Sequence, residues 1–314
     1  MPKKSHGPTV QRSVVFLGVD AGGSHTEVAL ALADGTVFAR ADGPGAAMRP
    51  GGAAASAAVM ADTARRAAAS AGVTLPAERM VVGAAGAGRA LERAELAAAL
   101  VASGVARQAE VMGDGELALW AAFAGGPGIL VNAGTGSIAY ARDPAGWLHR
   151  AGGFGWQMGD EGGGYWLGKR ALAAAGRAQD GRDDQSTLPT RLLSALGLKE
   201  FDDLVRWAAL AAPAQIASLA PHLINAATEG ERTAQAAVRE AATELADLVV
   251  ALGRHFPAEA TVAWAMAGGL LRPGTALAEA LRETVERRAP RSQLSTASID
   301  PAAVAAARAG RSQS

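Results

Sequence analysis

Residues 131–140 read VNAGTGSIAY, in which an apolar stretch runs into alternating glycine and hydroxyl residues before the chain becomes apolar again. A similar stretch, VDAGGSHTEVAL, occupies residues 19–30. Asp20 corresponds to Asn132, which lies 112 residues further along the chain. This spacing is too long for a solenoid repeat and is typical of a duplicated domain.

The segments around these two stretches predict an α/β protein whose halves begin alike. Apolar runs separated by Gly22-Gly23 and Asp34-Gly35 predict three antiparallel strands within residues 14–40. Alternating periodicities then predict helices over 53–72, 89–102 and 116–124, and strands over 79–86 and 109–114. The second half opens in the same order, with strands expected over 128–133, 137–142 and within 147–153.

A helical insertion is expected in the second half, after the glycine-rich segment 152–164. Its clearest helical patterns cover 189–197, 201–211 and 230–254, and a strand over 261–269 and a helix over 275–288 follow. The Asp-Pro pair at 300–301 and Gly310 predict a last helix between them. We place the domain boundary near 122–127, which gives one domain of residues 1–123 with 299–314 and another of residues 124–298.

The composition excludes several classes of protein. The 314 residues are 49% hydrophobic and 19% charged, and 30 basic side chains balance 30 acidic ones. This neutral charge favours neither a nucleic-acid partner nor an anionic membrane. The chain has no cysteine, which excludes disulfides and iron–sulfur clusters held by cysteine. No apolar run is long enough for a membrane span or a signal peptide, so we expect a cytoplasmic protein.

The two glycine-rich turns could each hold a phosphate group. Glycines let backbone N–H groups approach an anion that side chains would otherwise block. Hydroxyl groups at Ser24, Thr26, Thr135 and Ser137 add further donors. A single turn of this kind is explained equally well as a tight β-turn, but two turns in corresponding positions favour a function. The turns are not a Walker motif, because they join strand to strand and lack Gly-Lys-Ser/Thr.

Two carboxylates follow predicted strands. Asp114, in VMGDGELAL (111–119), stands where a strand ends and a helix begins, a position that exposes a side chain at the mouth of an α/β sheet. A carboxylate there can accept the proton of a hydroxyl that attacks a phosphate. The alternative role is helix N-capping, which is compatible with catalysis. Asp20 closes the first strand, where it could also simply begin a turn.

The order of a glycine hairpin, Asp114, a second glycine hairpin and MAGGLL (266–271) resembles the superfamily of sugar kinases, actin and heat-shock chaperone ATPases. The segment AGGFGWQMGDEGGGYWLGKRAL (151–172) is similar to the N-acetylglucosamine kinases and to the related activator ATPases of 2-hydroxyacyl-CoA dehydratases. The resemblance covers residues 14–310. It implies two duplicated ribonuclease H-like (actin-like ATPase) domains, with the helical insertion in the second and a cleft between them.

The resemblance also implies a role for individual residues. Asp114 corresponds to the general base, and Asp20 to the residue that binds Mg²⁺ through water. ATP would contact Gly22, Gly23, Ser24, His25, Thr26, Gly134, Thr135, Gly136, Gly268 and Gly269. The sugar would contact Asp114, Gly153, Asp160 and Glu161. Independently of the resemblance, Asp160 can accept hydrogen bonds from two sugar hydroxyls or can cap the helix that follows it.

The implied activity is phosphorylation of the C6 hydroxyl of N-acetylglucosamine or a related amino sugar, by a homodimer without nucleic-acid or membrane partners. Kinases of this kind usually offer an asparagine to the sugar ring after the third strand, but residues 41–52 contain none. Glucosamine and N-acetylmuramic acid therefore remain alternative substrates, and Glu161 could bind the ammonium group of glucosamine. An activator-type ATPase is disfavoured, because such proteins hold an iron–sulfur cluster with cysteines.

Overall fold

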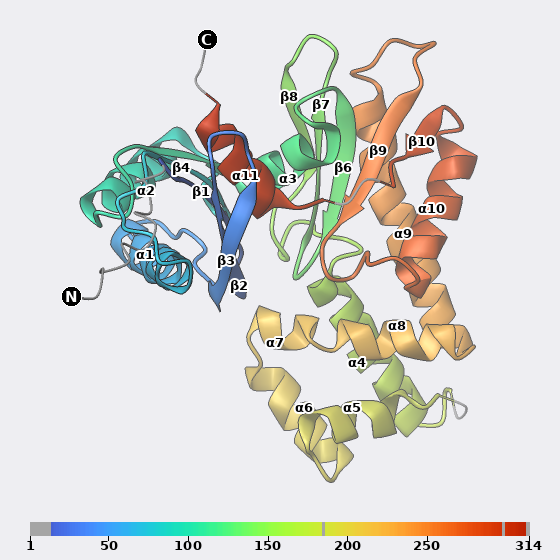
Figure 1. Ribbon diagram of the computed structural model, residues 1–314. Helices are drawn as coiled ribbons and strands as arrows, with labels where there is room; N and C mark the ends of the chain where they lie inside the picture. Colours follow the sequence, from blue (N-terminus) through green and yellow to red (C-terminus); the bar gives the residue numbers. More distant parts are fainter. Residues whose placement is uncertain (1–13, 184–185, 297–298, 312–314) are drawn as a thin grey trace, which may run out of the picture. The chain divides into compact units, whose positions relative to one another are not determined.

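The computed structural model describes residues 14–183, 186–296 and 299–311 (Figure 1). The chain divides into two compact units, residues 1–121 with 298–314 and residues 122–297. The domain ranges expected from the sequence also include residues 1–13, 184–185, 297–298 and 312–314, which lie outside the described residues. Each unit contains one five-stranded sheet.

The sheet of the first unit has the strand order β3-β2-β1-β4-β5. Its strands are β1 (Phe16–Ala21), β2 (His25–Ala31), β3 (Val37–Pro44), β4 (Arg79–Ala84) and β5 (Ala109–Gly113). The strands β1, β2 and β3 pair antiparallel, as the alternating sequence predicts, whereas β4 and β5 continue the sheet parallel to β1. The ends of β1 and β5 therefore lie at the same edge of the sheet.

Helices cover both faces of this sheet. One face packs against α1 (Ala53–Ser70) and α2 (Ala90–Ala102), and the other against α3 (Asp114–Phe123) and α11 (Pro301–Gly310). Gly18 allows the close approach of α11, because a Cβ atom there would lie 2.1 Å from the carbonyl oxygen of Ala302. Asp300 caps α11 by accepting a hydrogen bond of 2.9 Å from the N–H of Ala303, as the Asp-Pro pair predicts.

The second unit repeats this topology. Its sheet has the order β10-β9-β6-β7-β8, in which β6, β7 and β8 are antiparallel and β9 and β10 are parallel to β6. Its strands are β6 (Gly128–Ala133), β7 (Ser137–Arg142), β8 (Leu148–Gly152), β9 (Val262–Ala267) and β10 (Ser292–Leu294). Because β6 takes the place of β1, the predicted α/β fold with duplicated halves is confirmed.

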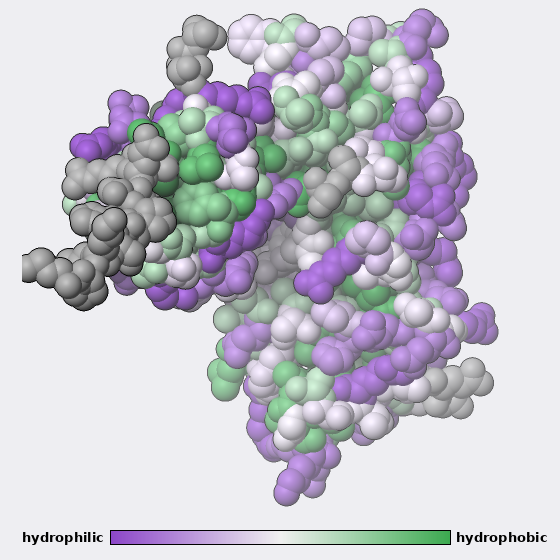
Figure 2. Space-filling view, viewed as in Figure 1, coloured by the Kyte–Doolittle hydropathy of each residue, from purple (hydrophilic) through white to green (hydrophobic). Residues whose placement is uncertain are grey.

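The helical insertion lies between β8 and β9, as predicted. It contains α4 (Gly164–Gln179), α5 (Leu188–Leu196), α6 (Phe201–Leu210), α7 (Pro213–Ala217), α8 (Ala220–Thr228) and α9 (Arg232–Gly253), and α10 (Ala276–Arg288) follows β9. The sequence analysis did not predict α7, α8 or β10, of which α7 and β10 have only five and three residues. In the view of Figure 2, hydrophilic side chains are prominent over the insertion. Among the described helices, none combines the length and the apolar character that a membrane crossing requires.

Candidate functional site

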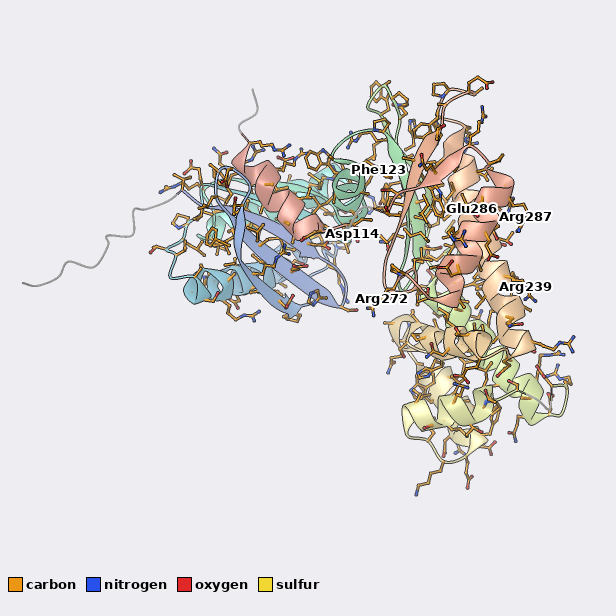
Figure 3. The ribbon with its side chains drawn as sticks, turned by 45° about the vertical axis from the view of Figure 1, so that its right-hand side comes forward. Asp114, Phe123, Arg239, Arg272, Glu286 and Arg287 are labelled. Carbon is orange, nitrogen blue, oxygen red and sulfur yellow. The ribbon has the colours of Figure 1, made fainter. Side chains whose placement is uncertain are left out.

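Two carboxylates lie at one edge of the first unit's sheet. Asp20 is the last residue but one of β1, and Asp114 begins α3 directly after β5 (Figure 3). The strand β4 lies between β1 and β5, and its Gly83 pairs with Asp20. A Cβ atom at Gly83 would lie 2.5 Å from Leu117 Cδ2, so glycine lets α3 pack closely against β4. This packing holds Asp114 near Asp20.

Burial raises the pKa of both carboxylates, and repulsion from neighbouring acids adds to the increase at Asp20. Burial raises the pKa of Asp20 from its ordinary 3.8 to about 7, and the charges of Asp114 and Glu27 add to the increase. Burial also raises the pKa of Asp114, although the backbone N–H of Gly115 favours its charged form. A cation or a polar ligand at this edge would restore the interactions that burial removes.

On the same face of the sheet as Asp20 lie three charged residues, Glu27, Arg40 and Asp300, that the sequence analysis did not predict as site residues. Glu27 pairs with Asp20 across the β1–β2 hairpin, and Arg40 on β3 forms an ion pair with Glu27. Arg40 also binds both carboxylate oxygens of Asp300, at 2.6 and 3.2 Å. Counting residues across the predicted hairpin could have placed Glu27 opposite Asp20. The contact between Arg40 and Asp300 joins residues 260 positions apart, which no local pattern indicates.

The first glycine hairpin exposes the residues at its tip. The N–H of Gly22 donates to the carbonyl oxygen of His25 at 2.8 Å, which closes the turn. Gly23 and Ser24 are exposed, and no backbone carbonyl among the described residues accepts from their N–H groups. Gly45 supports the turn, because a Cβ atom there would lie 2.1 Å from the carbonyl oxygen of Gly23. The tip thus offers backbone donors, as predicted.

The other two predicted residues of this hairpin, His25 and Thr26, lie on opposite faces of the sheet. His25 is exposed, and its Nε2 lies 3.1 Å from Asp42 Oδ1. Thr26 is fully buried on the same face of the sheet as Val28 and Leu30, next to α1. Because side chains alternate along a strand, this is the face opposite to Asp20. The Thr26 hydroxyl has no hydrogen-bond partner among the described residues.

The second glycine hairpin is held by the start of α4. The N–H groups of Gly164 and Tyr165 donate to the carbonyl oxygens of Gly134 and Thr135, both at 2.8 Å. A Cβ atom at Gly164 would lie 2.8 Å from the carbonyl oxygen of Gly134. Gly163 also leaves no room for a side chain, because a Cβ atom there would lie 2.6 Å from the carbonyl carbon of Gly136. The segment Gly-Gly at 163–164 is therefore required for this backbone contact.

Asp160 lies against this hairpin in a left-handed conformation, with φ of 64°. Such a conformation costs a non-glycine residue about 1–3 kcal/mol. Its Oδ1 accepts a hydrogen bond of 3.2 Å from the N–H of Gly155, and a Cβ atom at Gly136 would lie 2.2 Å from its Oδ2. Burial raises the pKa of Asp160, while the N–H of Gly155 acts in the opposite direction and the charge of Glu161 adds to the increase.

The remaining predicted sugar contacts surround Asp160. Gly153 has a positive φ of 69°, and its N–H donates to the carbonyl oxygen of Ser137 at 3.1 Å. Ser137 is buried, and its hydroxyl donates to the carbonyl oxygen of Glu161 at 2.7 Å. The Glu161 side chain itself is exposed. The structure thus brings Gly153, Asp160 and Glu161 together around the start of β7.

The turn after β9 completes the glycine cluster of the second unit, which consists of Gly134, Gly136, Gly163, Gly164 and Gly268. A Cβ atom at Gly268 would lie 2.3 Å from the carbonyl oxygen of Ala133 and 2.4 Å from Asn132 Oδ1. Gly269 is exposed beside the guanidinium of Arg272, which was not predicted as a site residue (Figure 3). Arg272 lies three residues after Gly269, so a search for cations near the motif would have found it.

The residues of the first unit fit a magnesium ion bound through water. Among the described residues, no three His, Cys, Asp or Glu side chains form a group that could hold a metal ion. Mg²⁺ keeps several of its waters and needs only one or two carboxylates. Asp20 and Asp114 provide two carboxylates whose repulsion a cation would relieve. The exposed N–H groups of Gly23 and Ser24 fit a phosphate group.

Two α/β units of the same topology, each with a glycine hairpin after its first strand, define a duplicated actin-like ATPase fold. The chain belongs to the BadF/BadG/BcrA/BcrD ATPase family, whose model matches residues 17–308. This match confirms the family resemblance that the motifs of the sequence predict. It includes both hairpins, both carboxylates and the glycine cluster.

Relatives with assigned names include sugar kinases. The N-acetylmuramic acid/N-acetylglucosamine kinase of Clostridium acetobutylicum is 36% identical over 137 residues, which are 43% of this chain and 45% of that protein. The chain spans about half the length of the curated relatives it matches. A structure from Chromobacterium violaceum, provisionally assigned as an N-acetylglucosamine kinase, is 30% identical with a TM-score of 0.76, covering 94% of this chain and 99% of that one.

A more distant structure shares the fold. The ROK family glucokinase of Streptomyces griseus, solved with glucose and AMPPNP, is 18% identical to this chain. The superposition covers 94% of this chain and 97% of the glucokinase, with a TM-score of 0.60. The predicted fold class is therefore confirmed.

Proposed function

We propose that this protein is an ATP-dependent kinase that phosphorylates the C6 hydroxyl of N-acetylglucosamine or a related amino sugar. The observation that carries the proposal is the partly buried pair of Asp20 and Asp114 beside an exposed glycine hairpin. A phosphoryl transfer to a hydroxyl needs a cation site, a proton acceptor and phosphate-binding backbone, and this edge of the sheet offers all three. The names of the Clostridium and Chromobacterium relatives support the choice of sugar.

Asp114 acts as the general base in this proposal. Its carboxylate orients the C6 hydroxyl and accepts the hydroxyl proton, while the hydroxyl oxygen becomes the nucleophile. Burial raises the pKa of Asp114, which makes it a stronger proton acceptor than an exposed aspartate. Bound Mg-ATP supplies the phosphoryl group and the neutralising cation.

The two hairpins hold the nucleotide in this proposal. Asp20 binds the hydrated Mg²⁺, and the N–H groups at the tip of the first hairpin, with Ser24 and His25, contact phosphate oxygens. In the second unit, Gly134, Gly136 and the pair Gly268-Gly269 present backbone without Cβ atoms to the nucleotide, and Thr135 adds its hydroxyl group. Arg272 adds a positive charge beside Gly269.

Asp160 binds the sugar in this proposal. The hydrogen bond from Gly155 and the contact with Gly136 fix its carboxylate, so it can accept hydrogen bonds from sugar hydroxyls without first becoming ordered. Gly153 and Glu161 lie beside it. Glu161 is the observation that favours glucosamine as a second candidate, because its exposed carboxylate could bind an ammonium group.

A side-by-side comparison of sugars tests this proposal. ADP release and sugar phosphate formation are measured for N-acetylglucosamine, N-acetylmuramic acid, glucosamine and glucose, with Asp114→Asn as the inactive control. We expect the highest kcat/KM with an N-acetylated sugar and phosphate on C6. A site built around an N-acyl group should reject an analogue that lacks it by several kcal/mol.

Each alternative gives a different result in this assay. Equal or faster turnover of glucosamine or glucose would contradict the N-acyl assignment but not the kinase. ADP release that no sugar stimulates, without any sugar phosphate, would contradict the kinase. The homodimer, the cytoplasmic location and the absence of nucleic-acid and membrane partners stay predictions from the sequence.

A further inference from the structure

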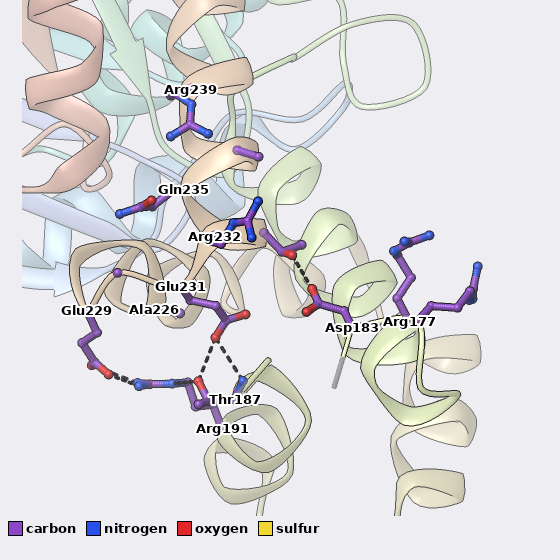
Figure 4. Close-up of a pocket in the computed structure, with 14 residues that line it drawn as sticks. Arg177, Asp183, Thr187, Arg191, Ala226, Glu229, Glu231, Arg232, Gln235 and Arg239 are labelled. Carbon is purple, nitrogen blue, oxygen red and sulfur yellow. Dashed lines mark hydrogen bonds and ion pairs between the residues drawn. The ribbon is translucent and has the colours of Figure 1, made fainter. Parts of the chain in front are cut away.

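The helical insertion of the second unit contains a pocket of about 1070 Å³ that no step of the proposed kinase uses (Figure 4). Its walls come from the end of α4, the start of α5, the end of α8 and the first two turns of α9. The helix α4 begins at Gly164 in the glycine cluster and reaches the pocket with Arg177. At 1.5 Å per residue, roughly 20 Å of helix separates the two. The pocket is therefore a separate place in the same unit.

Arginines dominate the lining of this pocket. Five arginines face three acidic residues, which leaves an excess of two positive charges. The arginines are Arg177, Arg182, Arg191, Arg232 and Arg239, and the acids are Asp183, Glu229 and Glu231. Because the whole chain has a net charge of zero, the residues outside this lining together carry two more negative than positive charges. The excess is therefore local to this pocket.

The acids of the pocket are already engaged in holding its walls. Glu231 accepts hydrogen bonds from the hydroxyl of Ser186 at 2.5 Å and from the N–H and hydroxyl of Thr187 at 3.0 and 2.9 Å. Glu229 forms an ion pair with Arg191, which also donates to the Thr187 hydroxyl at 2.7 Å. These contacts connect the start of α5 to the end of α8 and the start of α9. The walls of the pocket are thus fixed before any ligand binds.

Asp183 is engaged as well, because it accepts a hydrogen bond from the hydroxyl of Thr233. Arg182 forms two hydrogen bonds, of 2.8 and 2.6 Å, with Asp180 outside the lining. By contrast, Arg177, Arg232 and Arg239 form no ion pair or side-chain hydrogen bond with any of residues 14–183, 186–296 or 299–311. Three guanidinium groups around one pocket are therefore free to bind an anion.

The position of these arginines adds to the attraction for an anion. Arg232 is the first residue of α9, a helix of 22 residues, and Arg239 lies two turns further along it (Figures 3 and 4). The start of a helix carries a partial positive charge that adds to the charges of nearby side chains. Arg177 faces the pocket from α4. The free cations thus come from two helices.

We propose that this pocket is a second binding site of the protein and that it takes a small phosphorylated ligand. A phosphate group carries about two negative charges at neutral pH, which matches the excess of positive charge. Guanidinium groups bind phosphate oxygens with paired, directional hydrogen bonds, which a single ammonium group cannot do. The volume suits a ligand the size of a sugar phosphate or a nucleotide.

Binding to the intact chain tests the proposal. Titration calorimetry with inorganic pyrophosphate and with glucose 6-phosphate compares the natural chain with the double variant Arg232→Gln/Arg239→Gln. The two probes distinguish a polyphosphate ligand from a phosphomonoester. Because each charged hydrogen bond contributes markedly to affinity, we expect the double variant to bind the preferred probe at least about tenfold more weakly.

A matched control separates the pocket from general attraction of anions. The variant Arg206→Gln/Arg287→Gln removes the same charge from exposed positions of the same unit outside the pocket. It should bind like the natural chain. Equal weakening in both double variants, or no binding of either probe by the natural chain, would overturn the proposal.

Hydrogen exchange then locates the bound probe. We expect the probe to slow exchange in peptides covering 186–196 and 226–239, and this protection to disappear in Arg232→Gln/Arg239→Gln. Protection confined to the two glycine hairpins would show that the anion binds at the nucleotide site instead, and would overturn the proposal. The result does not depend on the kinase activity, since neither measurement requires turnover.

Discussion

The two glycine hairpins occupy the same place in two sheets of the same topology, yet they are built differently. In the first unit, β1 carries the carboxylate of Asp20 one residue before its end, and the hairpin tip at Gly23 is exposed. In the second unit, β6 carries the amide Asn132 at the matching position, and glycines of two other segments, Gly163-Gly164 and Gly268, pack closely against the hairpin. The first copy carries charge at this edge, whereas the second carries an amide and glycines that pack closely against its hairpin.

This difference indicates a division of tasks between copies of one motif. The charge of Asp114 raises the pKa of Asp20, and a cation bound between them would relieve this repulsion. The contacts of Gly163 and Gly164 stabilise the second unit without any ligand. We therefore expect substitutions in the first hairpin region to affect mainly chemistry and pH dependence, and substitutions in the second to affect mainly stability.

The largest effect is expected from Asp114→Asn. This change removes the proposed proton acceptor, and loss of a general base typically lowers the rate by about 10²–10⁴. Steady-state phosphorylation of the preferred sugar measures it, with Asp62→Asn on the exposed side of α1 as the control. Turnover near that of the control would show that Asp114 is not the base.

The next largest effect is the pH dependence that Asp20 imposes. The folded chain keeps the Asp20 proton up to about pH 7, whereas the unfolded chain releases it near pH 3.8. Between these values the native state binds more protons, so Asp20 lowers the free energy of unfolding as the pH rises. The variant Asp20→Asn should not show this pH-dependent loss. Above pH 7 its free energy of unfolding should exceed that of the natural chain by about 2–4 kcal/mol.

Urea unfolding at several pH values, without nucleotide or metal, measures this difference. Asp34→Asn provides a control of opposite sign, because the backbone N–H of Thr36 lowers the pKa of Asp34. Its stabilising contribution is present above the unfolded pKa and is lost as the pH falls. If natural chain and Asp20→Asn showed parallel pH profiles, Asp20 would not be the strained carboxylate of the first unit.

A smaller effect is expected from Gly163→Ala in the second unit. Its Cβ atom would meet the backbone of Gly136 at 2.6 Å, and overpacking of this kind costs about 1–3 kcal/mol. The matched substitutions Gly134→Ala and Gly23→Ala introduce a Cβ atom with no neighbour within 4 Å. Thermal unfolding should show a lower melting temperature for Gly163→Ala than for Gly134→Ala or Gly23→Ala. A similar loss of stability in Gly23→Ala would mean that the two hairpins do not differ in how closely they are packed.

The fold followed from the sequence because its signals are local. The alternation of residues 14–40 and the glycine turns fixed the antiparallel strands, and the position of Asp114 between a strand and a helix placed it at the edge of the sheet. The sequence analysis did not predict the helices α7 and α8 or the strand β10, because their patterns are short or continuous with those of neighbouring elements.

The parts of the site that the sequence could not show depend on contacts between distant segments. The expected domain ranges place residues 299–314 with the first domain, but no local pattern indicates that Asp300, before α11, meets Arg40 on β3. The same holds for Asp160, whose contact with Gly136 depends on how α4 begins. The sequence indicated a hydroxyl donor at Thr26, but the structure places this hydroxyl on the buried face next to α1.

The smallest effect concerns that hydroxyl and its counterpart. Thr26 pairs with Ala21 and Ser137 with Ala133, so the two residues hold equivalent positions after the two hairpins. Both are buried, but Ser137 donates to the carbonyl oxygen of Glu161, whereas the Thr26 hydroxyl has no partner in the described part of the chain. Burying a hydroxyl without a partner costs free energy, and losing a satisfied hydrogen bond costs about 1 kcal/mol.

Thr26→Val and Ser137→Ala should therefore shift stability in opposite directions. Thr26→Val keeps the shape of the side chain and should leave the free energy of unfolding unchanged or raise it by up to about 1 kcal/mol. Ser137→Ala should lower it by about as much, because the carbonyl group of Glu161 loses its donor. Urea unfolding of both variants at one pH measures the pair. A destabilised Thr26→Val would mean that the Thr26 hydroxyl has a structural partner, and this contrast between the two buried hydroxyls would then disappear.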